Sequence, residues 1–216
     1  MRLRTTFVVL AVGASLVSSP SLAEGPAFDC SKAGGEVEEL ICQDVGLAAL
    51  DRQLDEVYSA ALARAQNEHP PVLKAEQRGW IKGRNECWKA QGEDNPAFLT
   101  ASWQATSVHD CVEGQYRLRI SELQALYQLV PAKGPVFYGC ENDPANEVVA
   151  TFFETDPPTA RIERGDRAAT AWLVPAGSGA KYEGQNLEFW SKGDEARVTW
   201  LDQELTCQAK DSGGGE

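Results

Sequence analysis

The stretch SGAKYEGQNLEFWSKGDEA, residues 178–196, contains two turns joined by strand-like sequence. Ser178 lies between two glycines, and Lys192 is followed by Gly193. Glycine lets a backbone turn sharply and approach another group closely. The residues between the two turns are rich in aromatic and apolar side chains, which favour strands. The pattern predicts that strands hold Ser178 and Lys192 at a fixed separation.

The same strand pattern continues on both sides of this stretch, over residues 136–210. Turn-forming Gly, Pro, Asn and Asp residues separate the short apolar runs, as a small antiparallel barrel or sandwich requires. The eight predicted strands are 136–140, 147–153, 160–163, 168–174, 180–183, 187–191, 196–201 and 205–209. Residues 211–216 are polar and glycine-rich, and we expect a flexible tail there.

Before residue 131 the apolar residues recur with the period of a helix. We expect helices over about 36–66, 72–88 and 107–129, with Pro70-Pro71 breaking the chain between the first two. Residues 28–130 are therefore predicted to form a three-helix bundle, and residues 131–135 a linker to the strand domain. The predicted fold class is α+β in two domains.

Residues 1–23 have the features of a secretory signal peptide. A basic start precedes a short apolar run, and small residues stand where a signal peptidase cleaves. No other stretch is apolar enough to span a bilayer. Phe28-Asp29 precedes Cys30, which lacks the small-residue pattern that lipid attachment needs. We expect a soluble periplasmic protein rather than a lipoprotein.

All six cysteines follow this leader, which favours three disulfides in an exported protein. Cys140 and Cys207 lie near the two ends of the strand domain. A bridge between them is worth roughly 4 kcal/mol in the chain-entropy model. Cys30, Cys42, Cys87 and Cys111 belong to the helical domain. An antiparallel pair of helices favours Cys42 with either Cys87 or Cys111, and the sequence leaves the choice open.

The net charge is −12 for the whole chain, or −14 once the two arginines of the leader are removed. Such a charge argues against nucleic acid and anionic membranes as partners, and it permits a basic protein partner.

The sequence offers no constellation that favours catalysis, a metal or another cofactor. Ser178 is not in the strand-to-helix setting of a nucleophile elbow, and the strand domain has no histidine to serve as its base. His109-Asp110-Cys111 contains the residue types of a thiol site, but Cys111 is more simply a disulfide partner. We therefore expect no enzyme activity.

The helical half resembles the LprI N-terminal family, a four-cysteine helical domain of bacterial envelope proteins. The resemblance covers Cys30 to Tyr127. Its motifs are Phe28-Asp29-Cys30, Glu39–Cys42, Leu50–Leu54 with Tyr58, Gln77–Ile81, Arg84–Cys87, Cys111 and Tyr116–Ile120. The family commonly has Arg-Asp where this chain has Arg84-Asn85. For Gln77, Arg78, Trp80 and Arg84 we favour a packing role over ligand binding.

The strand half resembles the MliC family of c-type lysozyme inhibitors, over nearly all of 136–209. Its motifs are Tyr138-Gly139-Cys140, Ala150–Phe153, Asp156-Pro157-Pro158, Ser178–Tyr182, Phe189–Ala196 and Cys207. The resemblance implies an eight-stranded antiparallel β-barrel closed by one disulfide. It also implies that Ser178 and Lys192 enter the lysozyme cleft, with Gly179, Tyr182 and Gly193 in the same binding loops.

The sequence thus predicts an exported inhibitor of c-type lysozyme, a basic protein, that blocks the enzyme by occlusion. One alternative is an envelope module that binds peptidoglycan fragments or a muramidase. Trp88, Trp103 and Trp190 are its candidate sugar-stacking residues, although a role as core aromatics explains them more simply. The other is a periplasmic assembly protein without inhibitory activity.

Overall fold

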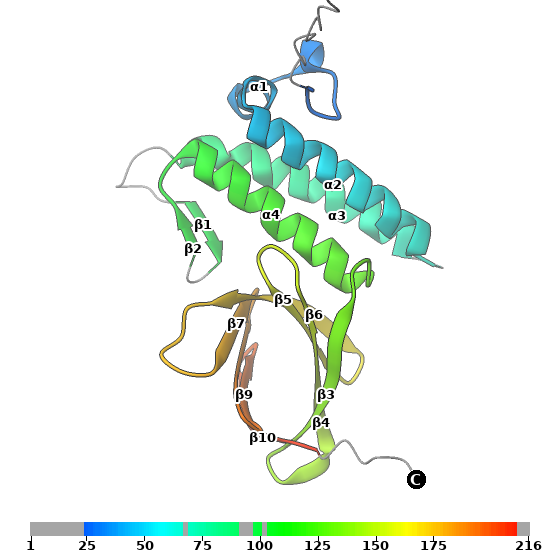
Figure 1. Cartoon of the computed structure of the whole chain (residues 1–216), viewed down its shortest axis with the longest axis vertical. Coiled ribbons are helices and arrows are strands. Elements are labelled where there is room, and N and C mark those ends of the chain that lie inside the picture. The colour runs from blue at the N-terminus through cyan, green and yellow to red at the C-terminus, as the bar shows by residue number, and fades with distance from the viewer. Residues whose placement is uncertain (1–23, 67–68, 91–96, 101–102, 211–216) are drawn as a thin grey trace, which may run out of the picture.

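The computed structural model describes residues 24–66, 69–90, 97–100 and 103–210. A layer of helices lies at one end of the molecule and a β-barrel at the other, with α4 beside the barrel (Figure 1). This arrangement confirms the predicted α+β fold class. The expected signal peptide 1–23 and tail 211–216 lie outside the described residues.

Among the described residues, the helical part contains four α-helices rather than the three predicted. They are α1 (Glu36–Gln43), α2 (Val45–Arg64), α3 (His69–Asn85) and α4 (Val108–Leu126), with short 3₁₀ helices at Cys30–Lys32 and Glu86–Lys89. The expected first helix, 36–66, is divided at Asp44. Asp44 has extended dihedral angles, and its carboxylate accepts a hydrogen bond from the Leu47 amide at 2.8 Å. Aspartate is a strong N-cap, so a new helix begins here.

The expected break at Pro70-Pro71 is also wrong, because both prolines lie inside α3. The helix begins at His69, which places them in its first turn. The amides of a first turn have no partner within the helix, so proline is tolerated there. Within the expected loop between the second and third predicted helices, β1 (Ala97–Thr100) pairs with β2 (Trp103–Ala105).

The disulfides of the helical part join Cys30 to Cys42 and Cys87 to Cys111. Our expectation that Cys42 pairs with Cys87 or Cys111 is therefore wrong. The 3₁₀ turn at Cys30–Lys32 lies against α1, which brings the Cys30 and Cys42 Cα atoms to 5.9 Å. The second bridge ties the 3₁₀ helix after α3 to the first turn of α4.

The core of the helical part forms around α4. The apolar stripe of this helix is buried and packs mainly against α2. The fully or almost fully buried members of the stripe are Val112, Tyr116, Ile120 and Leu123. Leu47, Leu54 and Ala61 from α2 and Leu73 from α3 fill the opposite side of the core.

The C-terminal part is a closed antiparallel barrel of eight strands in the order β10-β3-β4-β5-β6-β7-β8-β9. The strands are β3 (Ala132–Cys140), β4 (Asp143–Phe153), β5 (Thr159–Arg164), β6 (Arg167–Val174), β7 (Ala180–Gly184), β8 (Leu187–Lys192), β9 (Glu195–Trp200) and β10 (Gln203–Ala209). All eight predicted strands are confirmed. The predicted Cys140–Cys207 bridge is also present, between residues paired in register across β3 and β10.

The two parts are in direct contact through α4. Trp172 on β6 donates its indole N–H to the hydroxyl of the buried Ser121 on α4, at 2.8 Å. Arg117 on α4 forms an ion pair with Asp156 in the β4–β5 loop. Residues 132–135 of the expected linker belong to β3, where Ala132 and Lys133 already pair with β4. The connection from α4 to β3 therefore consists of residues 127–131 rather than 131–135.

Candidate functional site

Ser178 and Lys192 lie in connections at the same end of the barrel. Because adjacent strands are antiparallel, the β6–β7 loop (175–179) and the β8–β9 turn (193–194) open at one end. The register between β7 and β8 pairs Ala180 with Ser191, which places Gly179 beside Lys192. We refer to residues 177–179 and 192–193 as the rim. The structure thus brings Ser178 and Lys192 together.

Gly179 makes this approach possible. Its φ angle is +70°, a conformation that L side chains rarely adopt. A Cβ atom at this position would lie 2.3 Å from the Ser191 carbonyl oxygen and 3.1 Å from the Lys192 Cβ. Gly193 also has a positive φ, +59°, but a Cβ there would meet no atom within 4 Å. Gly179 therefore sets the distance between the loops, and Gly193 allows the turn.

Replacing Gly179 by alanine is expected to weaken both the barrel and any function of the rim. The positive φ alone costs a non-glycine residue about 1–2 kcal/mol, and the clash with Ser191 adds to this. Gly177→Ala is the matched control, because a Cβ at Gly177 meets nothing within 4 Å and its φ is not in the positive range. Urea unfolding of the two variants measures the difference, and equal stabilities would contradict the close packing described here.

Trp190 fixes the Ser178 loop from the neighbouring strand. Its indole N–H donates to the Ser178 carbonyl oxygen at 2.8 Å, and the Arg197 guanidinium lies 5.8 Å from its ring centroid. The sequence interpretation offers core packing or stacking on sugars for Trp190, and it misses this positioning role. The signal in the sequence is a tryptophan, whose indole N–H is a hydrogen-bond donor, on the strand next to a glycine-rich loop.

The side chains of Ser178 and Lys192 are exposed at the rim. Within the described part of the chain, Lys192 makes no ion pair and the Ser178 hydroxyl makes no hydrogen bond. Lys181, on the same pair of strands, differs: its ammonium contacts Glu183 at 2.9 Å and Glu188 at 3.0 Å. Hydrogen bonds to Glu183 and Glu188 raise the pKa of Lys181. Lys192 is therefore the ammonium at this site that is ready to pair with an external carboxylate.

Tyr182, which the resemblance places among the lysozyme-binding residues, is almost fully buried in the free protein. It is only 9% exposed and lies inside the barrel, with ring centroids 5.5 Å from Phe152 and 6.4 Å from Phe189. Burial raises the pKa of its hydroxyl. Along β7, side chains alternate between the two faces of the sheet, so Tyr182 points inward while Lys181 points outward. Its contribution is to pack the core from which the rim projects.

The other residues weighed for chemistry are placed as follows. Cys111 is in a disulfide, so its thiol is not available as a nucleophile. His109 is partly exposed, and its Nε2 lies 3.4 Å from an Asp44 carboxylate oxygen. Among the described residues, His, Cys, Asp and Glu side chains do not form a cluster of three or more that could hold a metal ion. The side chain of Trp103 lies outside the part of the chain that the structure describes.

Comparison with known families finds that the two parts are similar to two families of inhibitors. Residues 30–123 match the family described as "Lysozyme inhibitor LprI". Residues 138–206 match the family described as "Membrane-bound lysozyme-inhibitor of c-type lysozyme", abbreviated MliC. Both resemblances inferred from the sequence are thereby confirmed. The chain has an LprI-type helical part followed by an MliC-type barrel.

Curated relatives align with most of the chain. Proteins named "Lipoprotein LprI" from Mycobacterium tuberculosis and Mycobacterium bovis are 28% identical to this chain over 186 residues. The aligned region covers 85% of this chain and 84% of each relative. None of the helices in the described ranges is long and apolar enough to cross a membrane.

Proposed function

We propose that this protein is an exported inhibitor of c-type lysozyme that occludes the enzyme's active-site cleft with the rim of its barrel. Both matching families are families of lysozyme inhibitors. The observation that carries the proposal is the pairing of two available groups, the Lys192 ammonium and the Ser178 hydroxyl, on adjacent loops. Inhibition by occlusion requires no chemistry from the inhibitor, so we propose no enzyme activity.

The chemistry of the rim suits the chemistry of the enzyme. C-type lysozyme cleaves its substrate with two carboxyl groups, one kept protonated by an apolar environment and one ionised. A lysine ammonium is a compact cation that can pair with the ionised carboxylate. A serine hydroxyl can donate to, or accept from, the protonated acid. Lys192 and Ser178 are therefore assigned to these two partners.

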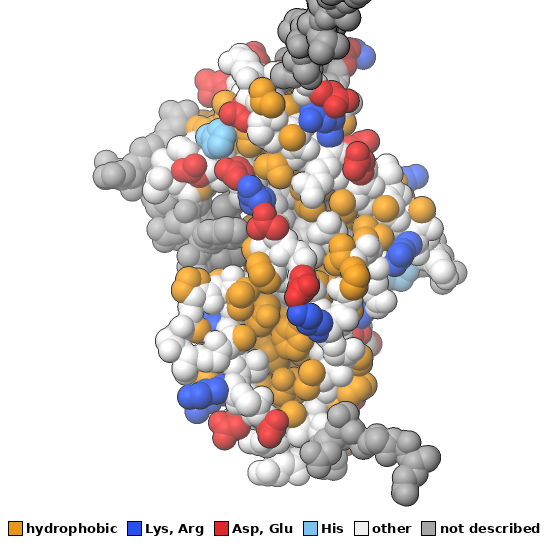
Figure 2. All heavy atoms as spheres, viewed as in Figure 1, with side chains coloured by type: hydrophobic (Ala, Val, Ile, Leu, Met, Phe, Trp, Pro, Cys, Tyr) orange, Lys and Arg blue, Asp and Glu red, His pale blue; other side chains and the backbone are white. Residues whose placement is uncertain are grey.

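The structure of the rim limits what binding must order. Gly179 packs against Ser191, and Trp190 holds the Ser178 carbonyl, so the backbone of both loops is fixed within the free protein. Affinity rises when less conformational entropy remains to be lost on binding. On the face shown in Figure 2, Asp and Glu side chains lie on the helical part and on the barrel. Together with the net charge, they favour rapid association with a basic enzyme.

We further propose that the protein acts in the periplasm as a soluble chain, after removal of the leader. The sulfur of Cys30 is bonded to Cys42, so it is not available for a thioether to lipid. The curated relatives carry the word lipoprotein in their names, which describes those proteins. Fractionation of cells, with mass spectrometry of the mature N-terminus, distinguishes a soluble chain that starts near Glu24 from a lipid-modified one.

Titration of c-type lysozyme with the full chain, residues 24–216, is expected to stop the clearance of a peptidoglycan suspension at a 1:1 ratio. Residues 132–210, the complete barrel, are expected to fold and to inhibit equally well, because the rim belongs entirely to the barrel. The helical segment 24–130 is the control and should not inhibit. If the barrel folds but only the full chain inhibits, the helical part contributes to the lysozyme contact. If neither inhibits, an envelope-binding or assembly role replaces the proposal.

A further inference from the structure

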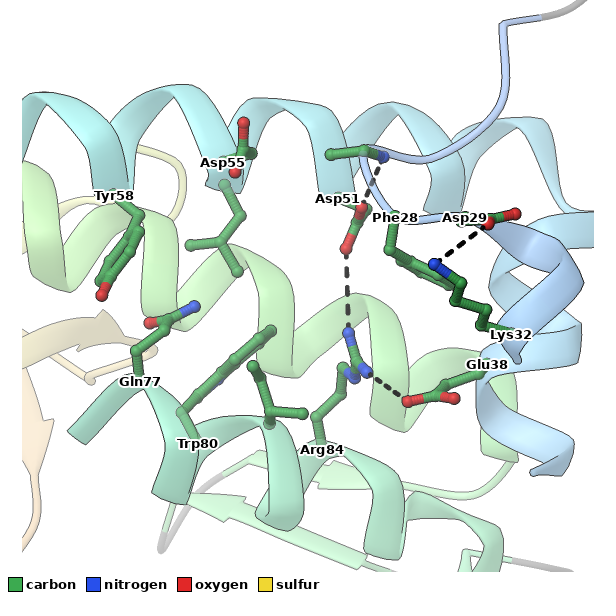
Figure 3. Close-up of a pocket in the computed structure, with 13 residues that line it drawn as sticks. Phe28, Asp29, Lys32, Glu38, Asp51, Asp55, Tyr58, Gln77, Trp80 and Arg84 are labelled. Carbon is green, nitrogen blue, oxygen red and sulfur yellow. Dashed lines mark hydrogen bonds and ion pairs between the residues drawn. The ribbon is translucent and has the colours of Figure 1, made fainter. Parts of the chain in front are cut away.

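A pocket of about 520 Å³ opens between α2 and α3, and all of its lining residues belong to the helical part (Figure 3). The segment 27–32 closes one end of it, and Tyr58 lies at the other end. Its lining residues are Ala27, Phe28, Asp29, Lys32, Glu38, Asp51, Leu54, Asp55, Tyr58, Gln77, Trp80, Ile81 and Arg84. A concave site of this size, with aromatic walls and a few convergent polar groups, is typical of small-ligand binding.

Arg84 is the central polar group of this pocket and is only 4% exposed. It extends from α3 toward Asp51 on α2 (Figure 3). One terminal nitrogen donates to the Tyr116 hydroxyl at 2.6 Å, while Nε and the other terminal nitrogen donate to the Asn85 amide oxygen at 3.1 and 2.9 Å. Tyr116 in turn donates to Asp51 at 2.7 Å. The guanidinium is thereby fixed in orientation.

Two of the five N–H groups of Arg84 remain without a hydrogen bond to any described residue. The terminal nitrogens lie 3.8 Å from Asp51 and 3.7 Å from Glu38, which are ion-pair distances too long for hydrogen bonds. Buried hydrogen-bond donors normally have acceptors, so these two N–H groups of Arg84 need an explanation. An oxygen acceptor of a ligand in the pocket would supply it.

The charge of the lining excludes an anionic ligand as the source of that oxygen. Four carboxylates line the pocket, from Asp29, Glu38, Asp51 and Asp55, against two cations, Lys32 and Arg84. Arg84 already neutralises the carboxylates nearest to it, and Lys32 lies 3.6 Å from Asp29. A phosphate or carboxylate would meet a surplus of negative charge, so a neutral acceptor such as a hydroxyl or an amide carbonyl fits better.

The apolar lining of the pocket indicates which kind of ligand carries the neutral oxygen acceptor. Aromatic rings of Phe28, Tyr58 and Trp80 line the pocket, and Leu54 and Ile81 add apolar surface between them. A pyranose ring combines apolar C–H faces with neutral hydroxyl oxygens, and an acetamido group adds a carbonyl. We infer that this pocket binds a neutral N-acetylated saccharide, with its rings against the aromatic walls and an oxygen on Arg84. Our sequence interpretation of Trp80 and Arg84 as packing residues describes only part of their role.

The test is a titration of the full chain with tri-N-acetylchitotriose, followed by ¹H–¹⁵N signals of the tryptophan indoles. The Trp80 signal, assigned with Trp80→Phe, should shift saturably, whereas that of Trp88, which is exposed outside this pocket, should not. Tyr58→Leu should weaken binding by about fivefold or more, because the saccharide loses its contact with the Tyr58 side chain. The size of the effect is that of one lost hydrogen bond. Because no lysozyme is present, the outcome is independent of the inhibitory function.

Two further arms identify the ligand and its source. An N-acetyl-lysine amide probe represents a cationic peptide, and it should leave the Trp80 signal unchanged. Sedimentation with purified peptidoglycan, with and without competing chitotriose, shows whether cell-wall glycan is bound as well as the free saccharide. The inference is overturned if millimolar chitotriose does not shift Trp80, if Trp80 and Trp88 shift alike, or if only the lysine probe binds.

Discussion

Lys192→Ala should weaken inhibition of c-type lysozyme by about 30-fold or more. Lys192 makes no ion pair within the described residues, so its ammonium is available to enter the cleft and pair with the ionised carboxylate. Truncating one partner of a desolvated ion pair costs about 2–5 kcal/mol, mainly through faster dissociation. Each 1.4 kcal/mol is about a tenfold change in affinity. The measurement is the inhibition constant of the variant, with folding checked by circular dichroism.

The control for Lys192→Ala must remove the same charge elsewhere on the barrel. Lys181 is close in sequence, but its ammonium lies 2.9 Å from the Glu183 carboxylate, which is 6% exposed, so removing it would also disturb the barrel. Arg167 is better, because it is exposed at the opposite end of β6 from the Ser178 loop. Arg167→Ala should change mainly the association rate and its salt dependence. If Lys192→Ala and Arg167→Ala weaken inhibition equally, diffuse attraction between charges explains the binding and insertion into the cleft does not.

Ser178→Ala belongs to the same series and should have a smaller effect than Lys192→Ala. The hydroxyl contributes a neutral hydrogen bond. Its loss leaves the protonated carboxyl group of lysozyme without a partner, which costs about 1–3 kcal/mol of binding free energy. The Ser178 carbonyl, which Trp190 holds, is unchanged by this substitution. The loop is therefore expected to keep its conformation.

Removal of the Cys140–Cys207 disulfide should destabilise the barrel by about 4 kcal/mol. The bridge joins residues 67 apart in the sequence, and such a loop restricts the unfolded chain strongly in the chain-entropy model. Small domains have thin cores, and total stabilities are about 5–15 kcal/mol, so this loss is a large fraction of the whole. Hydrogen exchange of the most protected barrel amides in a Cys140→Ala, Cys207→Ala variant measures the change.

The Cys30–Cys42 disulfide of the helical part provides the comparison. Cys30 and Cys42 are 12 residues apart, so the same model gives a smaller effect, about 3 kcal/mol. A Cys30→Ala, Cys42→Ala variant should lower the protection of helical amides and leave the barrel amides and inhibition unchanged. A loss of barrel protection below about 1 kcal/mol in the Cys140–Cys207 variant would show that the barrel does not depend on its bridge.

The barrel could be predicted well from the sequence because its signals are local. Glycine, asparagine and aspartate mark each turn, and the apolar runs between them are short. The inward position of Tyr182 could not be predicted, for a different reason. In β7, Ala180–Gly184, the residues on both faces include partly buried or buried positions, so the sequence alone does not show which face is inside. The pairing of β7 with β6 and β8 decides which face points inside, and that pairing depends on the closed barrel.

The helical part was predicted less well because its decisive features are capping and long-range contacts. The apolar stripe continues across Asp44, so periodicity gives one helix where an N-cap begins a second. The path of the chain before α1, which brings Cys30 to Cys42, has no periodic signal. The pocket between α2 and α3 likewise depends on how Asp51 and Arg84 meet through Tyr116, which no local pattern specifies.

The central claim, that Lys192 contacts the ionised catalytic carboxylate of lysozyme, is tested most directly by a double-mutant cycle. Wild-type protein and Lys192→Ala are each titrated by calorimetry against wild-type lysozyme and against a lysozyme whose ionised carboxylate is replaced by the amide. Close charge pairs at interfaces have coupling energies of about 1.5–7 kcal/mol. The effects of mutations at distant sites are additive within about 0.5 kcal/mol. We expect a coupling of at least about 1.5 kcal/mol between Lys192 and the carboxylate. Strictly additive effects would contradict the proposed contact.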